Sequence, residues 1–79
     1  MSNYEKYVNV FKETFELESE PVEGLEYQGI DNWDSVGHMA LIAALEDAFD
    51  IMMETDDIID FNSFKKGMEI LSTKYDIQF

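Results

Sequence analysis

Residues 35–50 constrain the fold more than any other part of the chain, because the run from Met39 to Leu45 contains no polar residue. Leu41, Leu45 and Phe49 recur every four residues, which is a helical spacing. Together with the neighbouring aliphatic residues, they cover more than half of the surface of a helix. Such a helix must lie at the centre of the fold and contact several neighbours.

An amphipathic helix is expected before it, over residues 3–16. Its apolar face carries Tyr4, Val8, Phe11 and Phe15, with Tyr7 and Val10 beside them. A connection of residues 17–33 follows, in which Pro21, Gly24 and Gly29 interrupt any helical period. A connection this long in a small domain is commonly functional or packed by its own side chains. The side chains available for that packing are Val22, Leu25, Tyr27 and Ile30, and Trp33 at the end of the connection is expected to pack over it.

Capping residues predict where the other helices begin. Asp34 suits the N-cap of the central helix, which should run from about Ser35 to Asp50. Thr55, followed by two aspartates, suits the start of a short helix. Asn62 or Ser63 is expected to cap a last helix, whose apolar face carries Phe64, Met68, Leu71 and Tyr75. Gly67 within that helix indicates a close contact between helices or a weak point.

Composition bounds the class of protein. The 79 residues, 46% of them apolar, predict a single folded domain over residues 1–79. Cysteine is absent, which excludes disulfides, thiolate catalysis and cysteine-based metal sites, and no metal site is expected. Eighteen acidic and five basic residues give a charge of −13, which repels nucleic acid and anionic membranes and favours partners with basic patches. No membrane span or signal peptide is evident, so a cytoplasmic location is expected.

One junction adds a chemical feature to this outline. Ser35 stands where the polar connection meets the central helix, so its hydroxyl should be exposed and able to carry a phosphate at the positive end of the helix. The sequence Trp33-Asp34-Ser35-Val36, with the Leu-Glu-x-x-Phe-Asp ending of residues 45–50, resembles the modification motif and second helix of acyl carrier proteins. The resemblance extends from Trp33 through Leu71 and is compatible with the first helix.

The resemblance implies a fold and a cofactor. The fold is an all-α four-helix bundle of acyl carrier type, with three longer helices, a short third helix and a long first loop. The cofactor is 4′-phosphopantetheine, attached to Ser35 from coenzyme A, with Asp34 helping the transferase and its metal ion. Such a protein is not an enzyme and has no catalytic residue of its own. It carries acyl groups as thioesters, and a monomer is expected.

The implied partners are a phosphopantetheinyl transferase and the enzymes that load and transfer acyl groups through basic docking patches. Six residues are expected to contact them: Val36, Met39, Glu46, Asp47, Asp56 and Asp57. Gly37 and Ala40 stand where carriers of fatty-acid synthesis usually place acidic side chains, which indicates a specialised acyl, lipid or secondary biosynthetic pathway. His38 is expected to be a surface residue that contacts partners, since no carboxylate at a suitable spacing orients it as a base.

Cargo storage and function class remain open at this stage. A cavity between the second and third helices would be lined by Met39, Ile42, Ala43, Met52, Met53, Ile58, Ile59 and Phe61, although the same residues could equally form an ordinary core. An aminoacyl or peptidyl carrier shares the fold and the serine, and no residue separates the two kinds of carrier. An acidic helical adaptor without a prosthetic group would explain the charge but not the Asp34-Ser35 junction.

Overall fold

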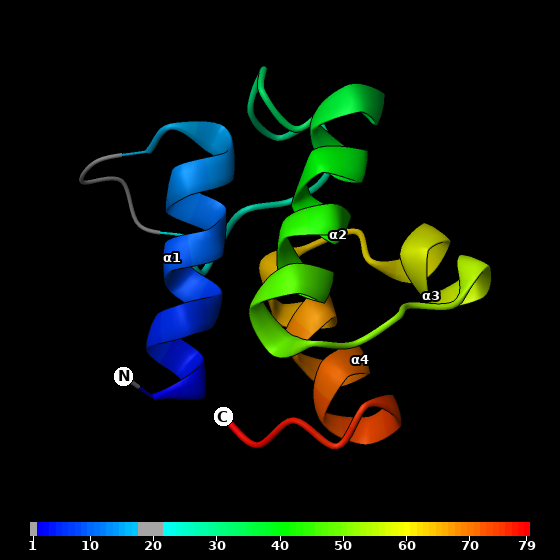
Figure 1. Cartoon of the computed structure of the whole chain (residues 1–79). Helices are drawn as coiled ribbons and strands as arrows, with labels where there is room; N and C mark the ends of the chain where they lie inside the picture. The colour runs from blue at the N-terminus through cyan, green and yellow to red at the C-terminus, as the bar shows by residue number, and fades with distance from the viewer. Residues whose placement is uncertain (1, 18–21) are drawn as a thin grey trace.

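Four helices make up the fold in this computed structural model, which describes residues 2–17 and 22–79. They are α1 (Asn3–Phe15), α2 (Ser35–Phe49), α3 (Thr55–Asp60) and α4 (Phe64–Lys74) (Figure 1). The predicted small all-helical bundle, with a short third helix, is confirmed. In the part of the chain that the structure describes, no helix is both long and apolar enough to cross a membrane.

Each of the three longer helices begins at a side-chain cap. Ser2 and Glu5 form a reciprocal capping box at the start of α1, and the Asp34 carboxylate accepts a hydrogen bond from the Gly37 amide at the start of α2. Ser63, not Asn62, caps α4 by accepting a hydrogen bond from the Lys66 amide. These caps satisfy amides that have no partner inside the helix, which is why the local sequence predicts the boundaries so closely.

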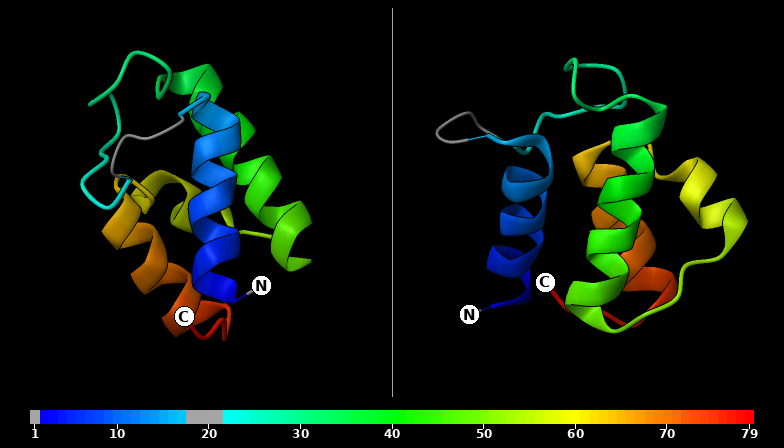
Figure 2. Two further views of the ribbon diagram at one scale, coloured as in Figure 1. Left: turned by 90° about the vertical axis from the view of Figure 1, so that its left-hand side faces the viewer. Right: turned by 45° about the horizontal axis from the view of Figure 1, so that its top comes forward.

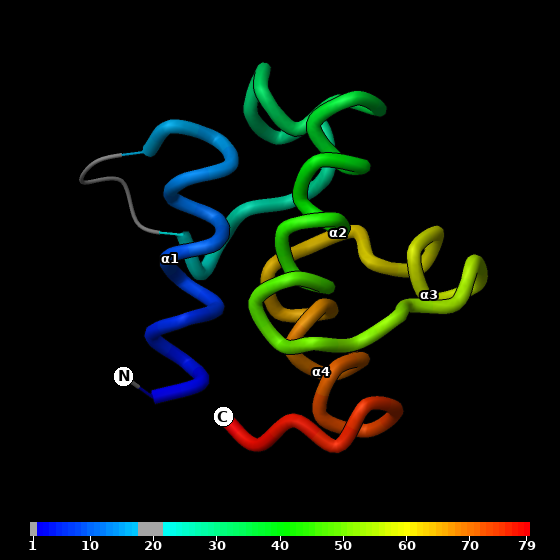
Figure 3. Tube along the Cα trace, viewed as in Figure 1, coloured from blue at the N-terminus to red at the C-terminus, as the bar shows by residue number. Residues whose placement is uncertain are grey.

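The helices enclose one hydrophobic core of aromatic and aliphatic side chains. α1 and α2 lie side by side and run in opposite directions, while α3 lies on the side of α2 away from α1 (Figures 1 and 2). The chain after α4 returns to the start of α1 (Figure 3). There the side-chain amide of Asn3 donates a hydrogen bond to the Gln78 carbonyl at 2.9 Å. The ring centroids of Tyr7 and Phe79 lie 5.2 Å apart.

The buried face of α1 differs by one position from the predicted stripe. Tyr7, Phe11 and Phe15 are buried, whereas Tyr4 and Val8 are only half-buried. The reason lies in α4, because the Tyr7 hydroxyl donates to the Phe64 carbonyl at 2.7 Å and its ring lies 4.8 Å from the Phe64 ring. Burial also raises the pKa of the Tyr7 hydroxyl, so it is a neutral donor at any ordinary pH.

The connection before α2 is fastened to the start of α4. The Phe64 amide donates to the Leu25 carbonyl and the Tyr27 amide to the Asn62 carbonyl, both at 2.9 Å, and an isolated antiparallel bridge joins Glu26 to Ser63. Of the four side chains predicted to pack this connection, Val22 is buried and Leu25, Tyr27 and Ile30 are half-buried. Pro21 lies outside the described residues. These bonds fix the position of Tyr27 beside α2.

Candidate functional site

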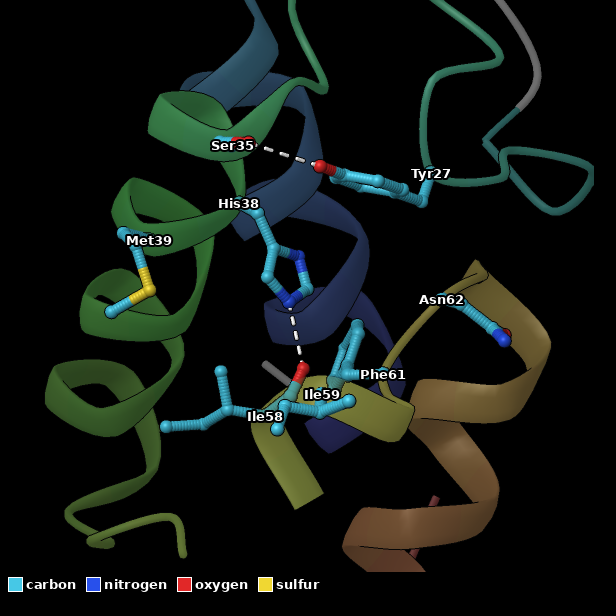
Figure 4. A pocket seen from close by; sticks show the side chains of 8 residues that line it. All are labelled: Tyr27, Ser35, His38, Met39, Ile58, Ile59, Phe61 and Asn62. Carbon is cyan, nitrogen blue, oxygen red and sulfur yellow. Dashed lines mark hydrogen bonds between the residues drawn. The ribbon is translucent and has the colours of Figure 1, made fainter. Parts of the chain in front are cut away.

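Ser35 is the first residue of α2 and is exposed, as predicted. Its Oγ lies 3.2 Å from the Tyr27 hydroxyl oxygen, and either group can donate the hydrogen bond (Figure 4). Asp34 is engaged with the Gly37 amide at 2.8 Å, while the helical pattern itself supplies no partner for the amides of Ser35 and Val36. An anion bonded to Ser35 Oγ would therefore lie at the positive end of α2.

A pocket of about 390 Å³ opens directly beside Ser35. Its walls come from the connection, α2, α3 and the turn before α4, and consist of Tyr27, Ser35, His38, Met39, Ile58, Ile59, Phe61 and Asn62 (Figure 4). This volume lies within the range of small-molecule binding pockets. The pocket is mainly apolar, and the Tyr27 hydroxyl supplies a polar group next to Ser35.

The predicted cavity between the second and third helices agrees with this pocket in four residues, Met39, Ile58, Ile59 and Phe61. The other four do not line it. Ile42 and Met53 belong to the buried core, whereas Ala43 and Met52 are exposed, with 86% of Met52 accessible. On α2, Ile42 faces the core, whereas Ala43, about 100° further around the helix, is exposed, so neither faces the pocket.

His38 is not the surface contact expected from the sequence. It is half-buried and bridges two elements: Trp33 Nε1 donates to its Nδ1 at 3.0 Å, and its Nε2 lies 2.8 Å from the Ile58 carbonyl oxygen. Because an indole N–H can only donate, Nδ1 carries no hydrogen and the neutral ring donates through Nε2. Both nitrogens are engaged, so neither accepts a proton from Ser35 while the bridge holds.

Trp33 packs as predicted and is fully buried. Its ring stacks on Phe15 at 5.3 Å and meets the edge of Phe11 at 5.5 Å. The side chain thus joins α1 to the start of α2 and holds His38 in place through Nε1. Tyr27 is the site residue whose place beside Ser35 the sequence did not reveal, because that place depends on hydrogen bonds between the connection and residues 62 and 64.

Five of the six expected docking residues are at least partly accessible. Val36 and Met39 are exposed on α2, with 80% of Val36 accessible, and Asp47 and Asp56 are exposed. Glu46 is half-buried and accepts a hydrogen bond from the Met53 amide at 2.9 Å, which ties it to the segment after α2.

Asp57 is a correction to that set, because only 2% of its surface is accessible. Its two carboxylate oxygens accept hydrogen bonds from Lys74 Nζ and the Tyr75 hydroxyl, each at 2.7 Å. The Tyr75 oxygen in turn accepts a hydrogen bond from the Glu54 amide at 2.8 Å. The bonds from Lys74 and Tyr75 lower the pKa of the Asp57 carboxyl, so this residue anchors α3 to the end of α4 and is not available for docking.

Replacing Asp57 by asparagine should destabilise the fold by about 1.5–3 kcal/mol at neutral pH, because a buried, charge-assisted network is lost. The pKa of Asp57 is lower in the folded protein than the ordinary value of 3.8, so its stabilisation is complete above that value. It disappears as the pH falls through the folded pKa. Urea titrations of the wild type and Asp57→Asn, from neutral to about pH 3, should show a stability gap that narrows with acid.

Asp56→Asn is the matched control, since Asp56 is exposed on the same helix. It removes the same charge and should leave no comparable gap at neutral pH. A gap of equal size in Asp56→Asn, or a gap for Asp57→Asn that does not change with pH, would contradict the anchoring role.

From the sequence, Gly37 is interpreted as a docking position that lacks an acidic side chain, but the structure gives a steric reason for the glycine. It is half-buried beneath the connection, and a β-carbon at this position would overlap the Asn32 carbonyl oxygen and meet the Phe15 ring at 3.3 Å. Steric contact therefore accounts for the lack of a side chain here. The uncharged exposed stripe on the first half of α2 consists of Val36, Met39, Ala40 and Ala43.

Comparison of the chain with protein-family models, with curated proteins and with solved structures gives no match. Within residues 2–17 and 22–79, no group of three or more His, Cys, Asp or Glu side chains is placed to hold a metal ion. The site is therefore interpreted from its own geometry: an exposed serine at a helix start, a tyrosine beside it and an adjoining pocket.

Proposed function

We propose that this protein is a carrier of acyl groups, with 4′-phosphopantetheine attached to Ser35. The observation that supports this most is the exposed Ser35 hydroxyl at the first residue of α2, at the rim of a pocket. Four helices, of which the third is short, support the proposal because the resemblance of the motif implies a bundle of this kind. When attached, the arm supplies a thiol, which this cysteine-free chain lacks.

Attachment requires an accessible nucleophile and a place for a phosphodiester. A separate transferase removes the Ser35 hydroxyl proton, and Oγ bonds to the pantetheine-bearing phosphorus of coenzyme A. The pyrophosphate P–O bond breaks and adenosine 3′,5′-bisphosphate leaves. The amides of Ser35 and Val36 and the dipole of α2 favour the resulting negative charge. The Tyr27 hydroxyl, 3.2 Å from Ser35 Oγ, would be a hydrogen-bond donor near this charge.

Partner enzymes would dock on the exposed side of α2 and α3. Val36 and Met39 supply apolar contact there, and Asp47 and Asp56 supply charge at the periphery. Charges of this kind increase the encounter rate and select partners more than they add affinity. The exposed stripe on the first half of α2 is uncharged. The proposed partners are therefore enzymes of a specialised pathway, and the surface with which they contact α2 would be apolar at its centre.

Incubation with coenzyme A and a promiscuous phosphopantetheinyl transferase should add one phosphopantetheine to the protein, measured by intact mass. Ser35→Ala should gain none, while its circular dichroism stays unchanged because Ser35 is exposed and contributes little to packing. Ser72→Ala, which removes an exposed hydroxyl on α4, should be modified like the wild type. If the wild type gains no mass while a known carrier does, the proposal is wrong and the acidic adaptor becomes the leading interpretation.

A further inference from the structure

The pocket beside Ser35 has an arrangement that bears on what occupies it. Ser35 is itself part of the wall, so a phosphate attached to its Oγ would leave the first atoms of the arm within reach of the pocket mouth. The thiol and any cargo lie at the opposite end of the arm. For the cargo to enter this pocket the arm would have to fold back on itself, whereas the proximal part of the arm would reach the pocket directly.

The inner end of the pocket is closed to a long chain. The hydrogen bond between His38 Nε2 and the Ile58 carbonyl, 2.8 Å long, crosses from α2 to α3 (Figure 4). The fully buried Phe61 lies behind it, with its ring 6.2 Å from the imidazole, and Trp33 fixes the other side of His38. An alkyl chain passing between α2 and α3 at this level would break the bridge and leave polar groups without partners.

The chemistry of the walls fits the proximal arm better than a saturated acyl chain. Apolar surface from Met39, Ile58 and Ile59 faces the pocket, and the Tyr27 hydroxyl stands at its rim. The pantoyl part of the arm carries two methyl groups on one carbon, then a hydroxyl and an amide. The methyl groups would pack against the isoleucines, and the hydroxyl or amide would lie near the Tyr27 hydroxyl. The arm thus matches both the apolar and the polar part of the pocket.

On the basis of the proposed function, we propose that this pocket binds the pantoyl part of the phosphopantetheine arm and leaves the cargo outside the bundle. The substrates would then be acyl groups presented to partner enzymes in the open, with the arm held against α2 and α3. Tyr27 is a positioning residue in this arrangement.

The test compares three forms of the isotope-labelled protein by NMR: unmodified, loaded from coenzyme A, and loaded from octanoyl-coenzyme A. Loading from coenzyme A, which attaches the arm without cargo, should already shift the NMR signals of the His38 and Ile59 amides and of the Trp33 indole N–H. Nuclear Overhauser contacts should join the geminal methyl groups of the arm to Ile58 or Ile59. Loading from octanoyl-coenzyme A should cause little further change in the chemical shifts of these residues. The amides of Ala44 and Ala48, in the separate groove between α1 and α2, serve as the unaffected reference.

Contacts from the octanoyl methylene groups to Ile58 or Phe61, without contacts from the arm methyl groups, would overturn the proposal in favour of stored cargo. If neither the octanoyl methylene groups nor the arm methyl groups contact the protein, the proposal is overturned as well. Loading is followed by intact mass in the same samples, so a failure of attachment is distinguished from a failure of arm binding.

Two exposed residues provide a matched pair of variants. Ile59→Ala shortens a wall of the pocket and should remove most contacts between arm and protein, whereas Met52→Ala shortens an exposed side chain that does not line the pocket and should leave them unchanged. Both residues are largely exposed, so both variants should fold. Tyr27→Phe should keep the methyl contacts but change the phosphorus chemical shift of the loaded protein, an effect that loss of packing alone would not produce.

Discussion

Replacing Trp33 by alanine should destabilise the protein by about 3–5 kcal/mol, the usual cost of emptying a large buried aromatic site. A domain of this size has little stability in reserve, so much of the population should be unfolded at room temperature. The expected result is a large loss of far-ultraviolet helical signal and a melting transition shifted far below that of the wild type. Intrinsic fluorescence is unsuitable for this variant, because Trp33 is the single tryptophan.

The effect should be large because Trp33 joins three parts of the structure. Its ring packs on Phe15 and Phe11 of α1, its backbone exchanges hydrogen bonds with Ile30 and Gln28, and Nε1 holds His38. Trp33→Phe is the matched control, since it keeps an aromatic ring and removes only the indole donor and part of the volume. It should remain folded. If Trp33→Ala melts within a degree or two of the wild type, the connection is not held by this side chain.

Helix boundaries and the exposed serine could be predicted because they depend on local chemistry. Asp34 and Ser63 each accept a hydrogen bond from the amide three residues later, and two aspartates lie in the first turn of α3, so a short stretch of sequence contains the whole signal. The exposure of Ser35 could be predicted because this residue stands where the connection meets the first turn of α2. Its proposed modification rests on a motif, and the arrangement of the site adds the Tyr27 contact and the pocket.

The roles of His38, Asp57 and Tyr27 could not be predicted in the same way, because their partners are distant in the sequence. Asp57 resembles the exposed acidic residues around it, yet its partners Lys74 and Tyr75 come from the end of α4. His38 bridges α2 and α3 because the Ile58 carbonyl lies opposite its Nε2. Sequence pattern reports which face of a helix is apolar but does not report which polar side chain meets a partner across the fold.

Gly67 shows the reverse case, in which a sequence signal was correct but had two interpretations. The structure supports the close contact, because a β-carbon at this position would overlap the Phe61 ring and the Tyr7 hydroxyl. Both side chains are fully buried and neither can move into solvent. Tyr7 is also held by its hydrogen bond to the Phe64 carbonyl.

Gly67→Ala should therefore destabilise the fold by about 2–3 kcal/mol, although alanine favours helix formation over glycine by about 1 kcal/mol. Overpacking outweighs propensity here because the added methyl group would force apart α4, the Phe61 ring and Tyr7. Gly24→Ala is the control: no atom lies within 4 Å of the β-carbon that would be added there, so its effect should stay within about 1 kcal/mol. Urea denaturation of both variants measures the difference, and an equal or higher stability of Gly67→Ala would show that α4 does not pack against Tyr7 and Phe61 as closely as described.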